Sequence, residues 1–191
     1  MADDTGLVAA LTEAQRLGFL GARPIGEVIE HARAFVVVLD GLPAAARVID
    51  LGSGGGVPGL VIAHDRPDLE VTLLDRRTKR TDFLQRVVRR LGWVDRVSVV
   101  ASDVTAFEPT PLFDAAVARG FGPPADTLTA AARVVRSGGR VVISEPPSGD
   151  RWEPEVLTAA GVQRITHSGN TVAVFLRLIH PEGRASDLTV D

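Results

Sequence analysis

The chain has no cysteine among its 191 residues, which excludes disulfides, thiolate metal sites and a cysteine nucleophile. It also lacks long hydrophobic runs. The apolar stretches 35–39 and 141–143 are far shorter than the roughly 20 residues needed to cross a bilayer. The acidic start Met1-Ala2-Asp3-Asp4 has neither the basic nor the apolar region of a signal peptide. We therefore expect a cytoplasmic protein without a membrane partner.

A strong charge of one sign is also missing, since 21 basic and 24 acidic residues give a formal net charge of −3. Any binding of nucleic acid must then depend on a local patch. Four histidines occur without the short spacing of a metal site, so we expect surface or turn residues and no metal: His31, His64, His167 and His180. The hydrophobic content of 45% is sufficient for one domain with a substantial core.

From residue 47 onward, short β-branched runs alternate with helical stretches, which predicts an α/β fold of the Rossmann-like, doubly wound type. The expected strands cover 47–51, 70–75, 97–101, 113–118 and 140–144, and the expected helices cover 57–66, 78–91, 124–135 and 153–160. A closing antiparallel hairpin of 162–166 and 171–178 around the turn 167–170 completes seven strands with helices on both faces.

The whole chain, 1–191, is predicted to be a single domain. Helical patterns around 8–17 and 28–39 indicate that residues 1–45 form a helical cap over the sheet or over the mouth of the site. Residues 46–179 form the expected core, and the polar segment 180–191 is expected to be a flexible tail.

The most informative segment reads Asp-Leu-Gly-Ser-Gly-Gly-Gly-Val-Pro-Gly over residues 50–59, between an apolar strand and a helix. Glycines allow a ligand to approach the backbone closely, and the N–H groups of the helix start face that ligand. The pattern predicts binding of an adenosine-containing cofactor, with Asp50, Ser53, Gly54 and Gly56 at the site. The alternative is a turn that only links strand to helix.

Two cofactors are compatible with these glycines, because Gly54, Gly56 and Gly59 also satisfy the dinucleotide pattern G-x-G-x-x-G. In a dinucleotide site, however, the first glycine follows the strand at once, whereas here the strand ends near Leu51. A carboxylate at Asp50 repels a pyrophosphate and attracts the ammonium or sulfonium group of S-adenosylmethionine. The sequence therefore favours S-adenosylmethionine over NAD.

Two further acids follow later strands. Asp75 ends the second strand at the spacing where an acid accepts hydrogen bonds from ribose hydroxyls, and its neighbour Arg76 is a further cofactor-binding candidate. Asp103 follows the third strand, where the adenine amino group is expected. For Asp75 the alternative is an exposed acid paired with an arginine, and for Asp103 it is a simple loop acid.

Eight basic residues and only two acids occupy the stretch 76–96. Arginine binds phosphates bidentately and stacks on bases, so a helix of this kind is suited to holding an RNA backbone, with Arg77, Lys79 and Arg80 as substrate-binding candidates. A solvated helix face is the alternative.

Two residues after later strands are candidates for catalysis. Arg119 follows the fourth strand in a glycine-rich loop, where it is placed to hold the cofactor or an anionic substrate, with a structural salt bridge as the alternative. Glu145, or Asp50, is the nearest base if the acceptor must lose a proton. A rigid turn at Glu145-Pro146-Pro147 is the alternative for that segment.

The loop 50–59, the run Leu73-Leu74-Asp75 with Lys79-Arg80 and Phe83-Leu84, and Ala118-Arg119-Gly120-Phe121 resemble the ribosomal small-subunit methyltransferase G family, also called the glucose-inhibited division protein B family. The resemblance covers roughly residues 47–144. It implies a class I methyltransferase that uses S-adenosylmethionine to methylate guanine N7 in small-subunit ribosomal RNA. It also places residues at the family's cofactor positions: Gly52, Val57, Val104, Thr105 and Arg119. This chain departs from the family at Thr105-Ala106, where the family has two acids, and at Glu145-Pro146, where it has lysine-glycine.

The sequence thus predicts an S-adenosylmethionine-dependent methyltransferase that acts on RNA, with ribosomal RNA as the acceptor implied by the resemblance. A small-molecule methyltransferase is the alternative that the acidic net charge and Glu145 leave open. An NAD-dependent oxidoreductase is disfavoured by Asp50 and by the closing hairpin, and a non-catalytic nucleotide-binding module also stays open.

Overall fold

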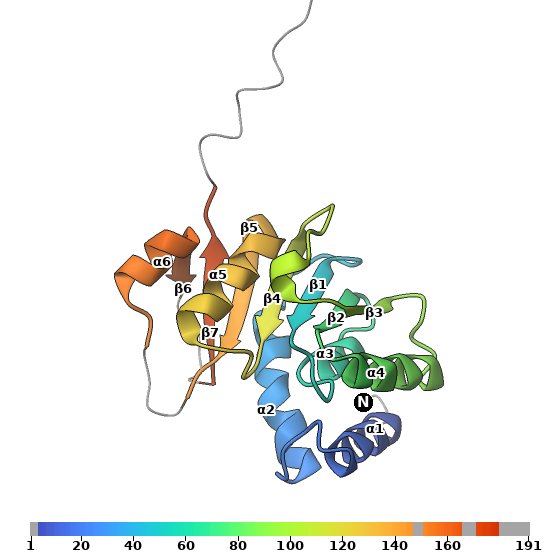
Figure 1. Ribbon diagram of the computed structural model, residues 1–191. Coiled ribbons are helices and arrows are strands. Elements are labelled where there is room, and N and C mark those ends of the chain that lie inside the picture. Colours follow the sequence, from blue (N-terminus) through green and yellow to red (C-terminus); the bar gives the residue numbers. More distant parts are fainter. Residues whose placement is uncertain (1–3, 147–150, 166–170, 180–191) are drawn as a thin grey trace, which may run out of the picture.

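The computed structural model describes residues 4–146, 151–165 and 171–179. Its centre is a seven-stranded sheet of order β3-β2-β1-β4-β5-β7-β6 (Figure 1). The strands are β1 (Arg47–Leu51), β2 (Glu70–Asp75), β3 (Val97–Ala101), β4 (Phe113–Ala118), β5 (Val135–Ser144), β6 (Val162–Ile165) and β7 (Val172–Arg177). Only β7 runs antiparallel to its neighbours, β5 and β6. The predicted α/β sheet with a closing antiparallel strand is confirmed.

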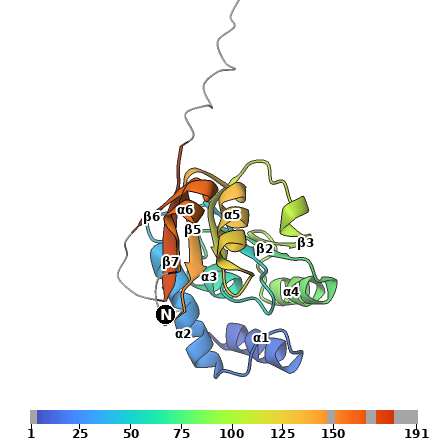
Figure 2. The same ribbon diagram turned by 60° about the vertical axis from the view of Figure 1, so that its left-hand side comes forward.

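Alternate residues of the central strands face opposite helical layers, because side chains along a strand alternate in direction. Val48 of β1 packs with the layer of α1 (Thr5–Arg16), α2 (Ile25–Val38), α3 (Gly59–Asp65) and α4 (Thr78–Arg90). Ile49 packs with α5 (Pro124–Val134) and α6 (Pro154–Ala160) on the other face. Figures 1 and 2 show these two layers enclosing the sheet. The central strands are buried on both faces, as expected for parallel strands.

The N-terminal helices bring their connecting segment, 17–24, onto the glycine loop. Gln15 holds this segment in place, since its Nε2 donates to the carbonyls of Gly21 and Arg23 at 2.6 Å each. A Cβ at Gly55 would lie 3.0 Å from the carbonyl oxygen of Phe19, so the two segments are in close contact. The N-terminal segment therefore forms one wall of the site.

Several boundaries differ from the prediction. Strand β5 begins at Val135 rather than at residue 140, because Val135 pairs with Phe113 before an irregularity in the β4–β5 register. Helix α3 begins at Gly59 rather than at residue 57, since the turn before it extends through Pro58. The predicted turn 167–170 and tail 180–191 lie outside the described residues. Among the described helices, none is both long and apolar enough to cross a membrane.

Candidate functional site

The glycine loop is held between two carboxylates at the ends of β1 and β2. The N–H of Gly59 donates to Asp50 Oδ2 at 3.0 Å, and the N–H of Gly54 donates to Asp75 Oδ2 at 2.9 Å. The carboxyl ends of parallel strands meet at one edge of the sheet, so both acids reach the same loop. The loop is therefore fixed at two points before any ligand binds.

Asp50 lies beneath the loop and lines neither of the cavities described below. It is 1% exposed, and its Oδ1 is buried without a hydrogen-bond partner among the described residues. Burial raises its pKa to about 7, although the hydrogen bond from Gly59 and the charge of Arg119 oppose this shift. The sequence predicted an open carboxylate at the strand tip. The structure corrects that orientation, because the side chain turns inward to the start of α3.

Gly52 requires the absence of a side chain for two reasons. Its φ of +68° is unfavourable for other residues, and a Cβ would lie 2.5 Å from the Phe121 ring. Ser53 is buried and donates its hydroxyl to the Asp50 carbonyl at 2.9 Å. The loop thus closes directly against Phe121, which follows β4.

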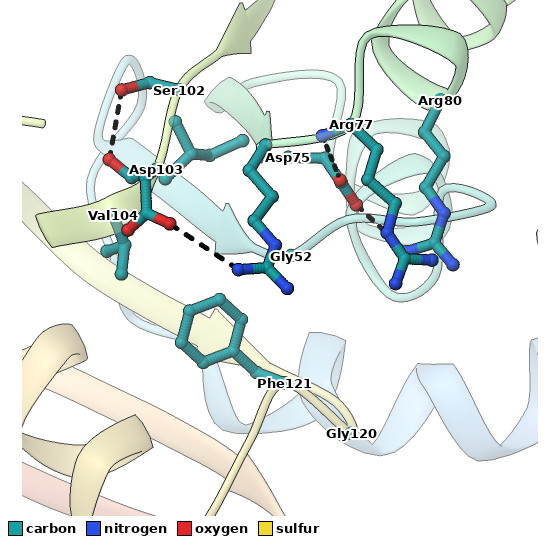
Figure 3. A pocket seen from close by; sticks show the side chains of 11 residues that line it. Gly52, Asp75, Arg77, Arg80, Ser102, Asp103, Val104, Gly120 and Phe121 are labelled. Carbon is teal, nitrogen blue, oxygen red and sulfur yellow. Dashed lines mark hydrogen bonds and ion pairs between the residues drawn. The ribbon is translucent and has the colours of Figure 1, made fainter. Parts of the chain in front are cut away.

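A cavity of about 370 Å³ opens above the ends of β2 and β3. We call it the β2-side cavity; its lining includes Gly52, Asp75, Arg76, Arg77, Arg80, Asp103, Val104, Gly120 and Phe121. Figure 3 shows Asp103 and Asp75 on opposite sides of it, with the Phe121 ring on a third side. Sequence reasoning missed Gly120 and Phe121 as lining residues, although both stand beside the predicted Arg119.

Asp75 has three partners in this structure. Its Oδ1 accepts the N–H of Arg77 at 2.9 Å, and its Oδ2 accepts, besides Gly54, the Arg80 guanidinium at 3.3 Å. A carboxylate has about four lone-pair positions, so a ligand hydroxyl can still reach Oδ1. Asp75, which the sequence predicts to accept a ribose hydroxyl, lines the β2-side cavity and keeps an unused lone pair on Oδ1.

Asp103 is ordered by its neighbour Thr105, whose N–H and hydroxyl donate to Oδ1 at 3.0 and 2.8 Å. These bonds hold the pKa of Asp103 below its usual range. Arg76 lies 3.8 Å from the other oxygen. Thr105 itself does not line the cavity and acts on it through Asp103, whereas Val104 lines it directly.

A second cavity, of about 740 Å³, lies above the ends of β4 and β5 and shares Gly120 and Phe121 with the first. We call it the β5-side cavity; its lining includes Arg23, His31, Arg119, Thr127, Glu145 and Arg151. Both candidates for catalysis, Arg119 and Glu145, are in this lining. Arg23, His31, Thr127 and Arg151 were not predicted as site residues, because no local motif marks them and only the fold brings them together.

Arginines dominate the electrostatics of the β5-side cavity. Burial lowers the pKa of Arg119, and the Asp50 carboxylate opposes that shift. Burial also lowers the pKa of His31, with the charges of Arg119 and Arg23 adding to the effect. His31 is therefore a neutral imidazole at pH 7, and the arginines give the cavity its cationic character. This corrects the expectation that His31 is a plain surface or turn residue.

The remaining substrate candidates extend outward from the β2-side cavity. Arg77, Lys79 and Arg80 border a shallow hollow with Leu17 and Phe19. Further along, Arg86, Arg89 and Arg90 are exposed on α4, where Arg90 pairs with Glu13 at 2.8 Å. Exposed basic side chains thus continue along α4 beyond Arg77 and Arg80, which line the β2-side cavity, and the acid Asp82 is exposed on the same helix.

One histidine differs from the prediction in another way. His64 lies on α3 with its side chain 8% exposed, and its Nδ1 is 2.7 Å from Asp65. Asp4 joins this group at the N-terminus of α1, and Arg33 pairs with both acids at 2.9 and 3.2 Å. Arg33 offsets one of the two carboxylate charges in this ion-pair network, in which the ligand atoms of Asp4, His64 and Asp65 lie within 4.8 Å of one another.

A family model described as rRNA small subunit methyltransferase G matches residues 7–156. The chain belongs to this family. The match includes most of α1 and all of α2, which lie outside the range 47–144 where the sequence motifs show the resemblance. The N-terminal wall of the site is therefore part of the methyltransferase G domain.

Curated relatives named ribosomal RNA small subunit methyltransferase G match parts of the chain. The protein of Chromobacterium violaceum is 39% identical over 101 residues, which is 53% of this chain and 48% of the relative. The protein of Neisseria meningitidis serogroup A is 37% identical over 112 residues, which is 59% of this chain and 53% of the relative. The chain thus spans about half the length of these relatives.

Solved structures share the fold. A methyltransferase from Geobacter sulfurreducens, in complex with S-adenosylhomocysteine, has a TM-score of 0.57 at 25% identity, with 72% of this chain and 65% of that chain covered. An O-methyltransferase family protein from Burkholderia thailandensis has a TM-score of 0.59 at 18% identity, with 79% of this chain and 57% of that chain covered. The cyclase SpnF has a TM-score of 0.58 at 24% identity, with 72% of this chain and 59% of that chain covered. Because a cyclase shares the fold, the fold alone does not define the reaction.

The buried Asp50 makes stability depend on pH. A carboxyl whose pKa rises to about 7 on folding is neutral in the folded protein at pH 5 but ionised in the unfolded chain, so it destabilises the fold increasingly up to pH 7. Asp50→Asn removes this effect. Relative to wild type, the variant should gain about 2–3 kcal/mol of unfolding free energy between pH 5 and 8, measured by urea denaturation. Parallel pH profiles for the two proteins would contradict the buried, neutral carboxyl.

Gly52→Ala should displace Phe121 and weaken binding of S-adenosylhomocysteine at least tenfold in a calorimetric titration. Gly92→Ala is the matched control, because Gly92 also has a positive φ, of +70°, but a Cβ there would meet no atom within 4 Å. Both variants should lose about 1–2 kcal/mol of stability from backbone strain, and only Gly52→Ala should lose the ligand. Equal affinities in the two variants would show that contact with Phe121 does not shape the cavity.

Proposed function

We propose that the protein is an S-adenosylmethionine-dependent methyltransferase that holds its cofactor in the β2-side cavity. The proposal rests on the position of the glycine loop. The loop is held by the hydrogen bond from Gly54 to Asp75, and its Gly52 lines the same cavity as Asp75 and Asp103. Asp75 Oδ1 has a lone pair for a ribose hydroxyl, and Asp103 has an exposed carboxylate for the adenine amino group. Val104 offers an apolar side chain to the adenine face.

When bound, S-adenosylmethionine supplies an electrophilic methyl group on a sulfonium. The chain's own task is then to position the acceptor and to exclude water. The β5-side cavity adjoins the cofactor cavity at Gly120 and Phe121, and this border is where donor and acceptor meet in the proposal. Arg119 at the same border provides a fixed cation for an anionic group of either ligand.

The proposed acceptor is RNA, and family membership supports small-subunit ribosomal RNA. Guanine N7 is the acceptor atom that the resemblance of the sequence implies. Guanine N7 attacks with a ready lone pair, so no proton must be removed first and no general base is required. The exposed arginines of α4, with Arg76 and Arg77 at the cavity mouth, are suited to phosphate contacts.

Calorimetric titration tests the cofactor. S-adenosylmethionine and S-adenosylhomocysteine should bind the wild type, and NAD should not. Asp75→Asn should weaken the adenosyl ligands at least tenfold, since hydrogen bonds to a charged acceptor contribute about 1.5–3 kcal/mol. Asp82→Asn on the exposed face of α4 is the control with the same change in charge, and it should bind like the wild type.

Two outcomes would contradict the cofactor assignment. Binding of NAD without the adenosyl ligands would restore the dinucleotide interpretation of the glycine loop. Equal affinities for Asp75→Asn and Asp82→Asn would remove Asp75 from the site.

Methyl transfer to small-subunit ribosomal RNA tests the acceptor. Borohydride reduction and aniline cleavage of the product should map the label to N7 of a guanine. RNA binding should weaken steeply between 50 and 200 mM salt, and Arg86→Gln should reduce the salt slope by about one. Arg136→Gln is the control, because Arg136 pairs with Asp114 near the start of β4, at the opposite end of the sheet.

A small-molecule acceptor is the second candidate, and the carboxylate of Glu145 in the β5-side cavity favours it. Such an acceptor makes no row of phosphate contacts, so its binding should not depend strongly on salt. Transfer to a small molecule, with none to RNA, would replace the first candidate by the second.

A further inference from the structure

Glu145 is a buried carboxylate without a role in the proposed reaction so far, because methyl transfer to guanine N7 requires no general base. It is 9% exposed and follows β5 in the lining of the β5-side cavity. Trp152 Nε1 donates to its Oε1 at 2.5 Å, and Arg151 Nε lies 3.6 Å from the same oxygen. No hydrogen bond to Oε2 is formed by any residue in the described part of the chain. One acceptor oxygen is therefore fixed by protein, and the other is available to a ligand.

The hydroxyl of Thr127 is a second polar group in the lining of the same cavity. Thr127, on the first turn of α5, is 2% exposed, and its Oγ1 is buried without a hydrogen-bond partner among the described residues. Buried hydroxyls without partners are uncommon, because leaving one unpaired costs about 1–3 kcal/mol. Thr127 on α5 thus adds an unpaired hydroxyl to the cavity that contains Glu145.

The chemistry of an ionised carboxylate selects among the RNA bases, because it only accepts hydrogen bonds. Guanine alone offers two adjacent donors on one edge, N1–H and the 2-amino group. Adenine and cytosine each offer one amino group beside a ring-nitrogen acceptor, and uracil offers one N–H between two carbonyls. A carboxylate facing the Watson–Crick edge of an unstacked base therefore favours guanine.

We propose that Glu145 receives a splayed-out guanine in the β5-side cavity, accepting its N1–H and 2-amino hydrogens. This inference rests on the proposed function, methyl transfer to guanine N7, and assigns the residue that selects the base. N7 lies on the opposite side of the purine from these donors. With the donor edge held at Glu145, the proposal places N7 at the border formed by Gly120 and Phe121, which line both cavities.

The same hydrogen bonds to Glu145 also stabilise the transition state of methyl transfer. The S–CH₃ bond breaks, the N7–CH₃ bond forms, and the positive charge passes from sulfur to the purine without loss of a proton. The N1–H and amino hydrogens become more acidic as this charge develops, so their bonds to Glu145 strengthen toward the transition state. Loss of the carboxylate should therefore lower kcat more than it raises KM.

The test compares Glu145→Gln with Glu153→Gln, a control at an exposed glutamate in the segment that precedes α6. Glutamine can still accept from Trp152 but presents an amide N–H₂ toward the base. In the first measurement, guanosine, 7-methylguanosine and adenosine 5′-monophosphates are titrated in the presence of S-adenosylhomocysteine. Wild type and Glu153→Gln should prefer guanosine to adenosine monophosphate tenfold or more, and 7-methylguanosine monophosphate more strongly still. Glu145→Gln should lose both preferences.

The second measurement uses RNA acceptors that carry guanine or inosine at the target position, since inosine keeps N7 but lacks the 2-amino group. Wild type should prefer guanine about tenfold in kcat/KM. Glu145→Gln should lower kcat for guanine 10- to 100-fold and discriminate little between the two bases. Glu145→Asp, which keeps the charge, should be slower than wild type but retain the preference.

The outcomes separate the two proposals. If the wild type methylates guanine and Glu145→Gln keeps its rate and its guanine preference, the role of Glu145 is refuted while the methyltransferase function stands. If the wild type methylates no RNA, the proposed function fails, and the nucleotide titrations still decide the base preference of Glu145. Unchanged binding of S-adenosylhomocysteine by each variant confirms that the fold is intact.

Discussion

The two hydrogen bonds that fix the glycine loop between β1 and β2 determine the rest of the site. Asp50 holds the start of α3 through Gly59, and Asp75 holds the middle of the loop through Gly54. With the loop fixed in this way, Gly52 closes against Phe121, and Phe121 separates two cavities. A buried acid with a raised pKa is costly, and its retention under the loop is consistent with a binding site that is formed before its ligand arrives.

The two cavities differ in their charge pattern. The β2-side cavity sets two carboxylates, Asp75 and Asp103, among arginines, which suits a ligand that offers hydroxyl and amino donors. The β5-side cavity has mainly arginines around one carboxylate, Glu145, which suits a ligand with phosphates and a donor edge. Their shared border gives the molecule a natural place for transfer of a group from one ligand to the other.

Much of the fold was predictable because local patterns define it. The βα alternation, the antiparallel closing strand and the acids after β2 and β3 are all short-range signals. The composition of the β5-side cavity was not predictable, because Arg23 and His31 come from the N-terminal part of the chain and Thr127 comes from α5, and only the fold brings them together. The inward turn of Asp50 was also missed, since a strand-end acid can face either the ligand or the following helix and the sequence does not distinguish them.

The central claim is that the glycine loop and Asp75 hold the adenosyl cofactor while the acceptor occupies the cavity across Phe121. A crystal structure of the complex with S-adenosylhomocysteine tests this claim most directly. The account predicts ribose hydroxyls on Asp75, adenine beside Asp103 and Val104, and the sulfur facing the β5-side cavity at Gly120 and Phe121. A ligand bound elsewhere, or one whose sulfur points away from that border, would contradict it.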